Sequence, residues 1–362
     1  MDSTVYFSNM AYSAYEADQT LPCKLVRQLK VSGLGKKVKN KKVAIKIHVG
    51  SEIGYSTIPP VFMRLLADFI KENGGDCFFT DHYIASRHPE RRGYTQESIG
   101  APIIEAAGHL GKYLYAKEVD WKTFKHVDVA GHIHDADFLI DFSHVKGHGS
   151  CAYGGAVKNI AMGCVSDRTR QEIHGLEGSL KWDKDKCTHC EACLRSCNHK
   201  ANSFNKKKEY EVNYHNCTLC QHCVKICPTG AITLTGSSYL DFQRGMALCT
   251  KTVLDSFKSG NVFYLNLLIS ITAMCDCWGL TTPYLVPDIG LMSSWDLAAI
   301  ETASLDQIKF EKLNPEGVPE GFKLGKKGHL FERLHGKDPY AQMKYLEEYG
   351  LGSSKYSLEM VK

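Results

Sequence analysis

Two runs of cysteine in the second half of the chain have the type and spacing of metal ligands. Each run reads C-x2-C-x2-C-x3-C, the first from Cys187 to Cys197 and the second from Cys217 to Cys227. This spacing lets a tight loop point three thiolates at one iron–sulfur cube, while the fourth cysteine ligates the other cube. The sequence therefore predicts two interleaved 4Fe–4S clusters. The expected ligands are Cys187, Cys190, Cys193 and Cys227 for one cluster, and Cys217, Cys220, Cys223 and Cys197 for the other.

Zinc binding and free thiols are the alternative interpretations of these runs. Zinc sites typically use two separated cysteine pairs, and two complete copies of this run are improbable by chance. The segment resembles bacterial two-cluster ferredoxins, and the ending CPTGAI, from Cys227 to Ile232, matches their usual ending. The first run departs from that pattern, because Asn198 stands where proline is common. Proline there is not a ligand, so we expect the departure to alter packing or potential, and not the presence of a cluster.

Two clusters held by interleaved ligands suit an electron relay, whereas one cluster would suffice as a structural staple. We therefore predict one-electron transfer. Low-potential clusters of this kind are oxygen-sensitive when exposed, which favours an anaerobic organism. The chain has 15 cysteines, and its first residues lack the basic start and apolar run of a secretory signal. This combination favours metal ligands or reactive thiols in the cytoplasm over a disulfide scaffold.

A second group of chemically capable residues lies between Ser143 and Cys164. This stretch leaves a predicted strand, crosses a glycine-rich bend and enters a predicted helix. Loops at the carboxyl ends of strands are where open α/β sheets bind ligands, and such a bend offers backbone N–H groups to an anion. An ordinary solvated turn is the alternative. The candidate residues are Lys146 and His148 for catalysis, and Gly154, Gly155 and Lys158 for binding an anion or a cofactor.

A third candidate is the sequence CDCWG, which follows the apolar stretch from Val262 to Met274. In an extended chain, Cys275 and Cys277 would lie on the same side. Two thiols placed in this way could bind a soft metal or act in redox chemistry. The alternative is that both are small buried hydrophobic residues at a strand end. We predict that Cys275 and Cys277 are catalytic residues.

The elements that must position these groups alternate between strands and helices. Residues 42–49 alternate apolar and polar side chains as a strand does, and residues 59–75 have an amphipathic helical pattern that two prolines open and two glycines end. The other predicted strands are 76–80, 126–129, 138–142 and 262–271. The other predicted helices are 97–107 and 295–305, with a helix and tail from 339 to 361.

This order of elements predicts an α/β fold with a mostly parallel sheet covered by helices. The cysteine-rich segment has few long apolar runs, so it needs a metal to hold it together and reads as an inserted ferredoxin-like module. The expected division is an α/β domain, first part, at 1–181, a 4Fe–4S insert at 182–236, and the second part of the α/β domain with the C-terminal tail at 237–362.

Several stretches together resemble the family of uncharacterised Fe–S centre proteins, which is built on a domain of unknown function. They are KIHVG, TDH, SHVKGHG, GGAVKNIAMGC, CDC and VPDIGLMSSWDLAAI. The resemblance runs over most of residues 40–310. It implies the architecture and a redox role, and it implies that these loops form one site. It gives no substrate.

The overall composition is that of an ordinary globular protein, with 43% hydrophobic and 23% charged residues. The formal net charge of +4 is too small to indicate a nucleic-acid or membrane partner. The longest apolar stretch is too short to span a bilayer. Lysines cluster at 36–42 and at 206–208, where we expect solvated surface, with a docking patch for an acidic redox partner as the minority interpretation.

The preferred hypothesis is an iron–sulfur oxidoreductase that passes electrons between two 4Fe–4S clusters and a small-molecule substrate or second cofactor in the α/β domain. That second cofactor could be a further metal, an anion or a redox group. A redox partner protein would exchange electrons with the clusters. The alternative is a non-enzymatic ferredoxin-like carrier or adaptor that docks to a larger redox complex. Structural clusters in a nucleic-acid-binding protein are a third interpretation, which the small net charge disfavours.

Overall fold

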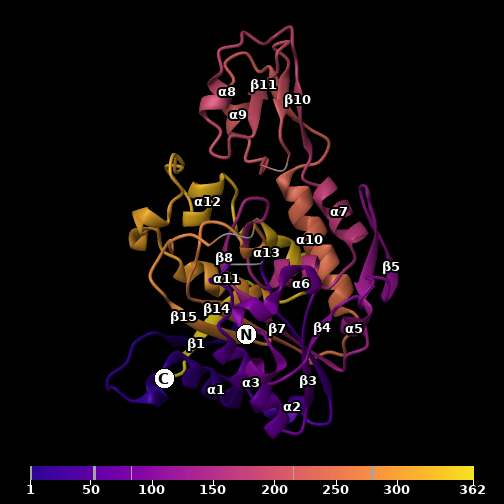
Figure 1. Cartoon of the computed structure of the whole chain (residues 1–362), viewed down its shortest axis with the longest axis vertical. Helices are drawn as coiled ribbons and strands as arrows, with labels where there is room; N and C mark the ends of the chain where they lie inside the picture. The colour runs from indigo at the N-terminus through magenta and orange to yellow at the C-terminus, as the bar shows by residue number, and fades with distance from the viewer. Residues whose placement is uncertain (1, 52–53, 83, 215, 279–280) are drawn as a thin grey trace.

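The computed structural model describes residues 2–51, 54–82, 84–214, 216–278 and 281–362. Within these residues, the body of the protein is built on an eight-stranded sheet with the strand order β16–β1–β15–β14–β7–β2–β3–β4 (Figure 1). The strands are β1 (Ser3–Asn9), β2 (Lys42–Lys46), β3 (Asp76–Asp81), β4 (Ile103–Glu105), β7 (Phe138–His144), β14 (Val262–Leu268), β15 (Gly290–Ser294) and β16 (Tyr356–Met360). Neighbouring strands run parallel except at β15, which is antiparallel to β1 and β14. The prediction of a mostly parallel α/β sheet is confirmed.

Helices cover both faces of this sheet and enclose two apolar cores. Alternate residues of one strand serve different cores, because successive side chains of a strand point to opposite faces. In β2, for example, Val43 and Ile45 belong to one core and Ala44 to the other. The first core includes residues of α1 (Leu21–Val31), α2 (Leu34–Val38) and α3 (Pro60–Glu72). The second includes residues of α6 (Ala156–Gly163), α7 (Asp167–Gly175), α10 (Tyr239–Leu254), α11 (Leu297–Gln307), α12 (Leu330–His335) and α13 (Ala341–Glu348).

Two local predictions were wrong, and a third was confirmed in an unexpected setting. The helix expected at 97–107 is a single turn, α4 (Gln96–Ile99), because Gly100 adopts φ 81° and Pro102 precedes β4. The expected C-terminal tail continues after α13 into β16, which pairs in parallel with β1. The strand expected at 126–129 is confirmed as β6 (Phe124–Ala130), which pairs with β5 (Leu114–Trp121) in a two-stranded sheet separate from the main sheet and is followed by α5 (Gly131–His134).

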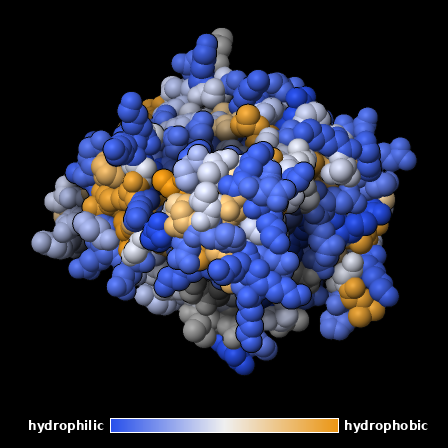
Figure 2. All heavy atoms as spheres, turned by 90° about the horizontal axis from the view of Figure 1, so that it is seen from above, coloured by the Kyte–Doolittle hydropathy of each residue, from blue (hydrophilic) through white to orange (hydrophobic). Residues whose placement is uncertain are grey.

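The cysteine-rich segment projects from one end of the molecule, at the top of Figure 1. It contains two small antiparallel sheets and two single-turn helices: β10 (Ser179–Trp182) with β13 (Ile232–Thr235), β11 (Asn202–Phe204) with β12 (Tyr210–Val212), α8 (Ala192–Arg195) and α9 (His222–Ile226). Its buried apolar cluster is small and includes two cysteines, Cys193 and Cys223, beside Ile232. Viewed from above, the molecule shows a mainly hydrophilic surface with small, separate hydrophobic patches (Figure 2). Among the described residues, no helix combines the length and the apolar character needed to cross a membrane.

Candidate functional site

The eight cysteines of the two runs surround two cavities. Cys187, Cys190, Cys193 and Cys227 line the first, and Cys197, Cys217, Cys220 and Cys223 line the second. Each cavity therefore takes three cysteines from one run and the fourth from the other. This is the arrangement that the sequence predicts for two interleaved clusters, and their iron content stays a prediction.

The two cysteine loops share an unusual backbone conformation. His189 and Glu191, two and four positions after the first cysteine, have φ angles of 54° and 56°. Leu219 and Gln221, at the equivalent positions of the second run, have φ angles of 51° and 62°. Non-glycine residues rarely adopt this left-handed conformation, and it persists only where the surrounding structure determines it. Its repetition at equivalent positions indicates that the two loops have the same ligand-binding role.

The fourth cysteine of each run accepts a backbone hydrogen bond. The N–H of Ala201 donates to Cys197 Sγ and the N–H of Ala231 donates to Cys227 Sγ, each at 3.2 Å. Hydrogen bonds of this kind favour a thiolate, and thiolates are the ligands of iron–sulfur clusters. The donor set and the backbone of the module therefore fit two 4Fe–4S clusters.

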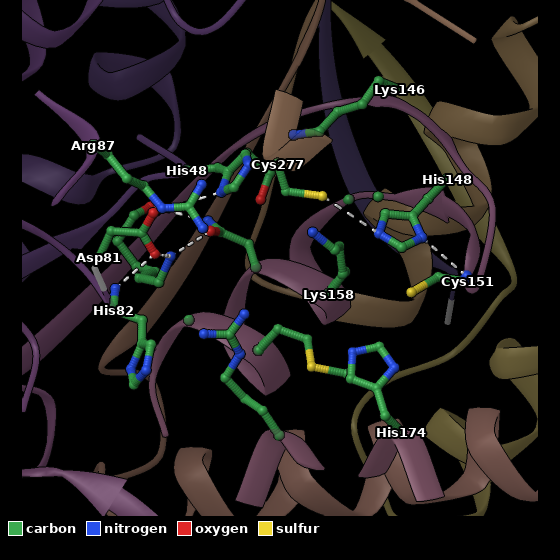
Figure 3. A pocket seen from close by; sticks show the side chains of 18 residues that line it. His48, Asp81, His82, Arg87, Lys146, His148, Cys151, Lys158, His174 and Cys277 are labelled. Atoms are coloured by element: carbon green, nitrogen blue, oxygen red, sulfur yellow. Dashed lines mark hydrogen bonds and ion pairs between the residues drawn. The ribbon is translucent and has the colours of Figure 1, made fainter. Parts of the chain in front are cut away.

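A second site lies in the α/β body, in a cavity of about 90 Å³ (Figure 3). It is formed where β2, β3 and β7 end, which is where open α/β sheets bind ligands. The short hairpin of β8 (Lys146–His148) and β9 (Ala152–Gly154) and the start of α6 complete it. Predicted residues that line it are Lys146, His148, Gly154, Gly155, Lys158 and Cys277. Lining residues outside the predicted set include Lys46, His48, Asp81, His82, Arg87, Cys151, Arg170 and His174.

Cys275 and Cys277 meet in a turn of 3-10 helix (Asp276–Trp278), and not in the extended chain that we expected. The N–H of Cys277 donates to Cys275 Sγ at 3.4 Å, and Lys158 Nζ lies 3.3 Å from the same sulfur. Cys275 is fully buried, whereas Cys277 is half-buried and lines the cavity. His148 Nε2 lies 3.8 Å from Cys277 Sγ, on the cavity side (Figure 3).

The pKa values of the two thiols are shifted in opposite directions. Burial acts to raise the pKa of Cys275, but the hydrogen bond from Cys277 and the charges of Lys158 and Lys146 hold it well below its ordinary value. The same hydrogen bond, together with burial, raises the pKa of Cys277. Burial acts to lower the pKa of Lys158, yet the neighbouring sulfur raises it. These shifts favour a thiolate at Cys275, 3.3 Å from the ammonium of Lys158, and a protonated thiol at Cys277.

Asp276 anchors this turn through contacts with three neighbouring side chains. Its carboxylate accepts hydrogen bonds from Ser56 Oγ at 2.8 Å and from His144 Nδ1 at 2.9 Å, and Lys146 Nζ lies 3.3 Å away. Burial acts to raise the pKa of Asp276, but the charges of Lys146 and His144 lower it. Lys146 thus holds the thiol-bearing turn in place and contributes positive charge to it.

A further network lies on the side of the cavity opposite His148. Lys46 Nζ contacts Asp81 Oδ1 at 2.9 Å and Asn159 Oδ1 at 2.5 Å, and His48 Nδ1 lies 3.5 Å from Asp81 Oδ2. His48 Nε2 in turn lies 3.8 Å from Cys275 Sγ. Burial acts to raise the pKa of Asp81, but the charge of Lys46 and the hydrogen bond of His48 hold it well below its ordinary value. The anionic Asp81 therefore orients His48 toward the thiol pair.

The backbone N–H groups after the glycine-rich bend are not free. The N–H groups of Ala156 and Val157 donate to the carboxylate of Glu301, at 2.8 and 3.4 Å. A side chain on Gly155 would meet that carboxylate, since an added Cβ would lie 2.4 Å from Glu301 Oε1. A carboxylate of the chain therefore already accepts these two N–H groups, and the binding of an anion or a cofactor by Gly154, Gly155 and Lys158 stays a prediction. Gly154, Gly155 and Lys158 still line the cavity.

The two sites are joined at Gly149, the residue that follows His148. An added Cβ at Gly149 would lie 2.4 Å from Thr218 Cγ2, so the two residues are in close contact. Thr218 is the neighbour of Cys217 in the second cysteine loop. The buried Lys337 bridges the same junction: its Nζ donates to the carbonyl oxygens of Gly149 at 3.0 Å and of Thr218. The residue next to His148 therefore contacts the residue next to Cys217.

The family model described as a domain of unknown function (DUF362) matches residues 43–306. The chain belongs to this family. The match covers every candidate residue of the cavity and the turn, and it confirms the predicted membership of a domain-of-unknown-function family.

Curated relatives of this DUF362 chain match smaller parts of it. A ferredoxin of Methanothermococcus thermolithotrophicus is 32% identical over 56 residues, which are 16% of this chain and 93% of the ferredoxin. Subunit I of the NAD(P)H-quinone oxidoreductase of Gloeobacter violaceus is 32% identical over 70 residues, which are 17% of this chain. The chain spans only 34% of that subunit's length. The similarity to ferredoxin supports an iron–sulfur electron-transfer character.

Two solved structures are distantly similar to the DUF362 chain. A structural-genomics protein from Thermotoga maritima has a TM-score of 0.38 and 12% identity, over 70% of this chain and 52% of its own. The lactate racemase apoprotein from Thermoanaerobacterium thermosaccharolyticum has a TM-score of 0.35 and 12% identity, over 74% of this chain and 51% of its own. Both likenesses are too weak to carry an argument about the site.

Sequence reasoning assigned no role to most of the charged wall of the cavity. His48 and Asp81 lie in two of the segments that carry the family resemblance, KIHVG and TDH, and each follows or ends a strand. The rule that ligands bind at the carboxyl ends of parallel strands would therefore have selected both. Cys151 and Arg170 carry no comparable signal, because their approach to the cavity depends on how β9 and α7 pack.

Proposed function

We propose that this protein is an iron–sulfur oxidoreductase with two 4Fe–4S clusters in the module at 182–236 and a small-molecule site in the cavity of the α/β domain. Such clusters accept and donate single electrons at potentials set by their surroundings. The proposed ligands are Cys187, Cys190, Cys193 and Cys227 for one cluster, and Cys197, Cys217, Cys220 and Cys223 for the other. In the cavity, the proposed catalytic residues are Lys146, His148, Cys275 and Cys277, and the proposed binding residues are Gly154, Gly155 and Lys158.

One observation carries the link between the two sites. The loop that places His148 at the cavity is the same loop whose next residue, Gly149, packs on Thr218 of the second cysteine set. Lys337 then ties both backbones together with hydrogen bonds that are buried. A carrier that only docked to other proteins would have no need for this contact. The junction therefore supports electron exchange between the module and the cavity.

The residues of the cavity are suited to an anionic substrate. Lys158, Arg87 and Arg170 line it. Four histidines also line it and can donate or accept protons: His48, His82, His148 and His174. A redox partner protein would exchange electrons at the projecting module, and the quinone oxidoreductase relative, itself a subunit, is in keeping with such an assembly. We further propose, from the cysteine content and from the oxygen sensitivity expected of exposed low-potential clusters, a cytoplasmic location in an anaerobic organism.

The first test is the metal content of protein prepared without oxygen. We expect about eight iron atoms and about eight labile sulfides per chain, a brown colour, and paramagnetic signals on reduction with dithionite. The second test is turnover with reduced methyl viologen as electron donor and a series of small anionic acceptors. Turnover should fall on replacement of Cys275→Ala or Lys146→Ala, and should persist in a Cys77→Ala variant, whose thiol is buried in β3.

Two results would contradict this proposal. Zinc in place of iron, or clearly fewer irons than two cubes require, would remove the electron-transfer function. Full turnover in both cavity variants would show that the cavity is not the site of the reaction. Recovery of a stoichiometric redox partner with no turnover of any acceptor would favour the carrier or adaptor function.

A further inference from the structure

The thiol pair at Cys275 and Cys277 has a division of roles built into its geometry. Cys275 is fully buried and touches Lys158, whereas Cys277 lines the cavity and faces His148. We propose that these two cysteines form a reversible dithiol–disulfide couple that reacts with small anionic disulfides. In this couple, Cys277 attacks the substrate and Cys275 first acts as its base and then resolves the mixed disulfide.

The forward reaction balances without any external oxidant other than the substrate disulfide. The Cys277 thiol passes its proton to the Cys275 thiolate, and Cys277 sulfur attacks one sulfur of R–S–S–R. A bond forms between Cys277 and R–S, and the first R–S⁻ leaves. Cys275 sulfur then attacks Cys277 sulfur and the second R–S leaves, carrying the proton that Cys275 held. The products are the Cys275–Cys277 disulfide, one R–S⁻ and one R–SH, as in ordinary thiol–disulfide exchange.

The return to the dithiol rests on the proposed function. Breaking the Cys275–Cys277 bond takes two electrons and one proton and restores one thiolate and one thiol. Single electrons supplied at the junction beside Gly149 would serve this purpose in two steps, and any dithiol reductant could replace them in a test. The exchange chemistry itself is independent of the module.

The positions of the neighbouring groups fit these roles. Lys158 Nζ, 3.3 Å from Cys275 Sγ, stabilises the thiolate that accepts the proton of Cys277. The two sulfurs lie within 4.8 Å of each other, so a rotation of the side chains brings them toward the bonded distance of about 2.05 Å. The other charged or titratable groups that face the pair are His48, His148 and, through Asp276, Lys146.

A single soft metal ion is the competing explanation, because ligand atoms of His148, Cys275 and Cys277 all lie within 4.8 Å of one another. Two contacts oppose it. The Nδ1 atom of His148 accepts the N–H groups of Ser150 at 3.1 Å and Cys151 at 3.2 Å. The neutral imidazole then carries its proton on Nε2, which is the atom that faces Cys277 and would have to bind the metal. The ammonium of Lys158 also supplies the positive charge that a metal would bring.

The substrate class follows from the walls of the cavity. Beyond the thiol pair, the lining includes Arg87, Lys158 and Arg170, whose charges favour a ligand that carries carboxylates. Cys277 is the sulfur of the pair that such a ligand meets, because Cys275 has no exposed surface. A small disulfide with carboxylate groups satisfies both conditions.

The test uses the full protein, prepared without oxygen, with oxidised glutathione as the anionic disulfide and 2-hydroxyethyl disulfide as a neutral comparison. After acid quenching, alkylation and digestion with trypsin, residues 259–309 form one peptide whose only cysteines are Cys275 and Cys277. We expect this peptide to gain an internal disulfide, at least tenfold faster with the anionic probe, with two thiols released for each disulfide consumed. The peptide 147–158, whose only cysteine is Cys151, should stay reduced and serves as the internal control.

Variants separate the roles. Cys277→Ser should abolish reaction with the probe, and Cys275→Ser should stop at a mixed disulfide on Cys277. The rate of formation of that mixed disulfide should fall at least tenfold at pH 7 and should rise with pH in Cys275→Ser, because the internal base is lost. Lys158→Met should move the same pH profile upward, an effect that a purely structural lysine would not produce. The exchange takes no electrons from the module, so a protein that forms the internal disulfide but shows no turnover with reduced methyl viologen would contradict the proposed function and leave this inference standing.

Three results would overturn the proposal. The first is a peptide that keeps both thiols free in oxidised glutathione. The second is a wild-type protein that accumulates the mixed disulfide without the internal one. The third is zinc, copper or nickel bound at about one ion per chain beyond the cluster iron and lost in Cys275→Ser, which would establish the metal site instead.

Discussion

The two candidate sites of this molecule are built in opposite ways. The cysteine module takes all its proposed ligands from two short loops with the same spacing and the same left-handed backbone positions. The cavity of the α/β body takes its groups from the ends of separate strands, from Lys46 in β2 to Cys277 after β14. The module can therefore be predicted from a local sequence motif, but it has little apolar core of its own. The cavity has no such local motif, but the elements that form it pack on a large apolar core.

The largest expected effect is the response to iron removal. Without metal, the module has only a small apolar cluster around Cys193, Cys223 and Ile232, so we expect it to lose its structure. Hydrogen exchange should show loss of protection in the two sheets β10–β13 and β11–β12. The strands β2, β7 and β14 should keep their protection, because both of their faces are buried in the cores of the α/β body. Protected module amides in iron-free protein would contradict this contrast.

The next largest effect is expected from Asp81→Asn in the cavity. This change leaves the ammonium of Lys46 buried with no anionic partner, and breaking a buried pair in this way costs about 3–5 kcal/mol. Urea unfolding should show this loss, while the iron content of the module stays the same. Asp120→Asn is the matched control, since its contact with Lys125 lies at the surface and is screened by water. Equal effects of the two substitutions would contradict a buried charge network.

The same contrast explains what could be read from the sequence. The cysteine spacing divided the eight thiols into the same two sets that line the two cavities, because the partners of each set are encoded by local loop geometry. The β2, β3 and β7 strands were found from short stretches rich in apolar residues, and the α3 and α11 helices from helical patterning. Lys146, His148 and Cys277 were found because they follow strands or apolar stretches. These signals need no knowledge of the strand order.

The remaining features depend on contacts between distant segments. The carboxylate of Glu301, from α11, accepts the N–H groups at the start of α6. The sequence near Gly155 does not predict this contact. The pairing of Lys46 with Asp81 and Asn159 requires β2 to lie beside β3 and under α6. β16 pairs with β1 from the other end of the chain. Local patterns contain none of this information, which is why the electrostatic wall of the cavity was missed.

A smaller effect is expected at the junction that couples the two regions. Lys337 donates to carbonyl oxygens from both regions, so Lys337→Met leaves these groups unpaired and should destabilise the protein by about 3 kcal/mol. It should also lower the reduction potential of the cluster at Cys197, Cys217, Cys220 and Cys223, because a nearby positive charge is lost. Thermal unfolding and a potentiometric titration would measure the two effects.

The control for this substitution is Lys186→Met, beside the first cysteine set. Lys186 is exposed and pairs with Asp183 at the surface, so water screens its charge. We expect neither the unfolding temperature nor either potential to change appreciably. If Lys337→Met shifted the potentials of both clusters equally, the charge of Lys337 would not act mainly on the second cluster.

The smallest effect is expected from a single methyl group at Gly149. In Gly149→Ala, the new Cβ would lie 2.4 Å from Thr218 Cγ2 in a contact that has no spare room. The side chain of Thr218 is buried, so the module must move slightly away from the α/β body, at a cost of about 1–2 kcal/mol. Gly175→Ala is the matched control: an added Cβ there meets nothing within 4 Å and the residue lies in α7, so helix propensity should stabilise the variant by about 0.5 kcal/mol. Changes of opposite sign in the free energy of unfolding would establish that Gly149 packs tightly against the module. No change in Gly149→Ala would show that other contacts hold the module to the α/β body.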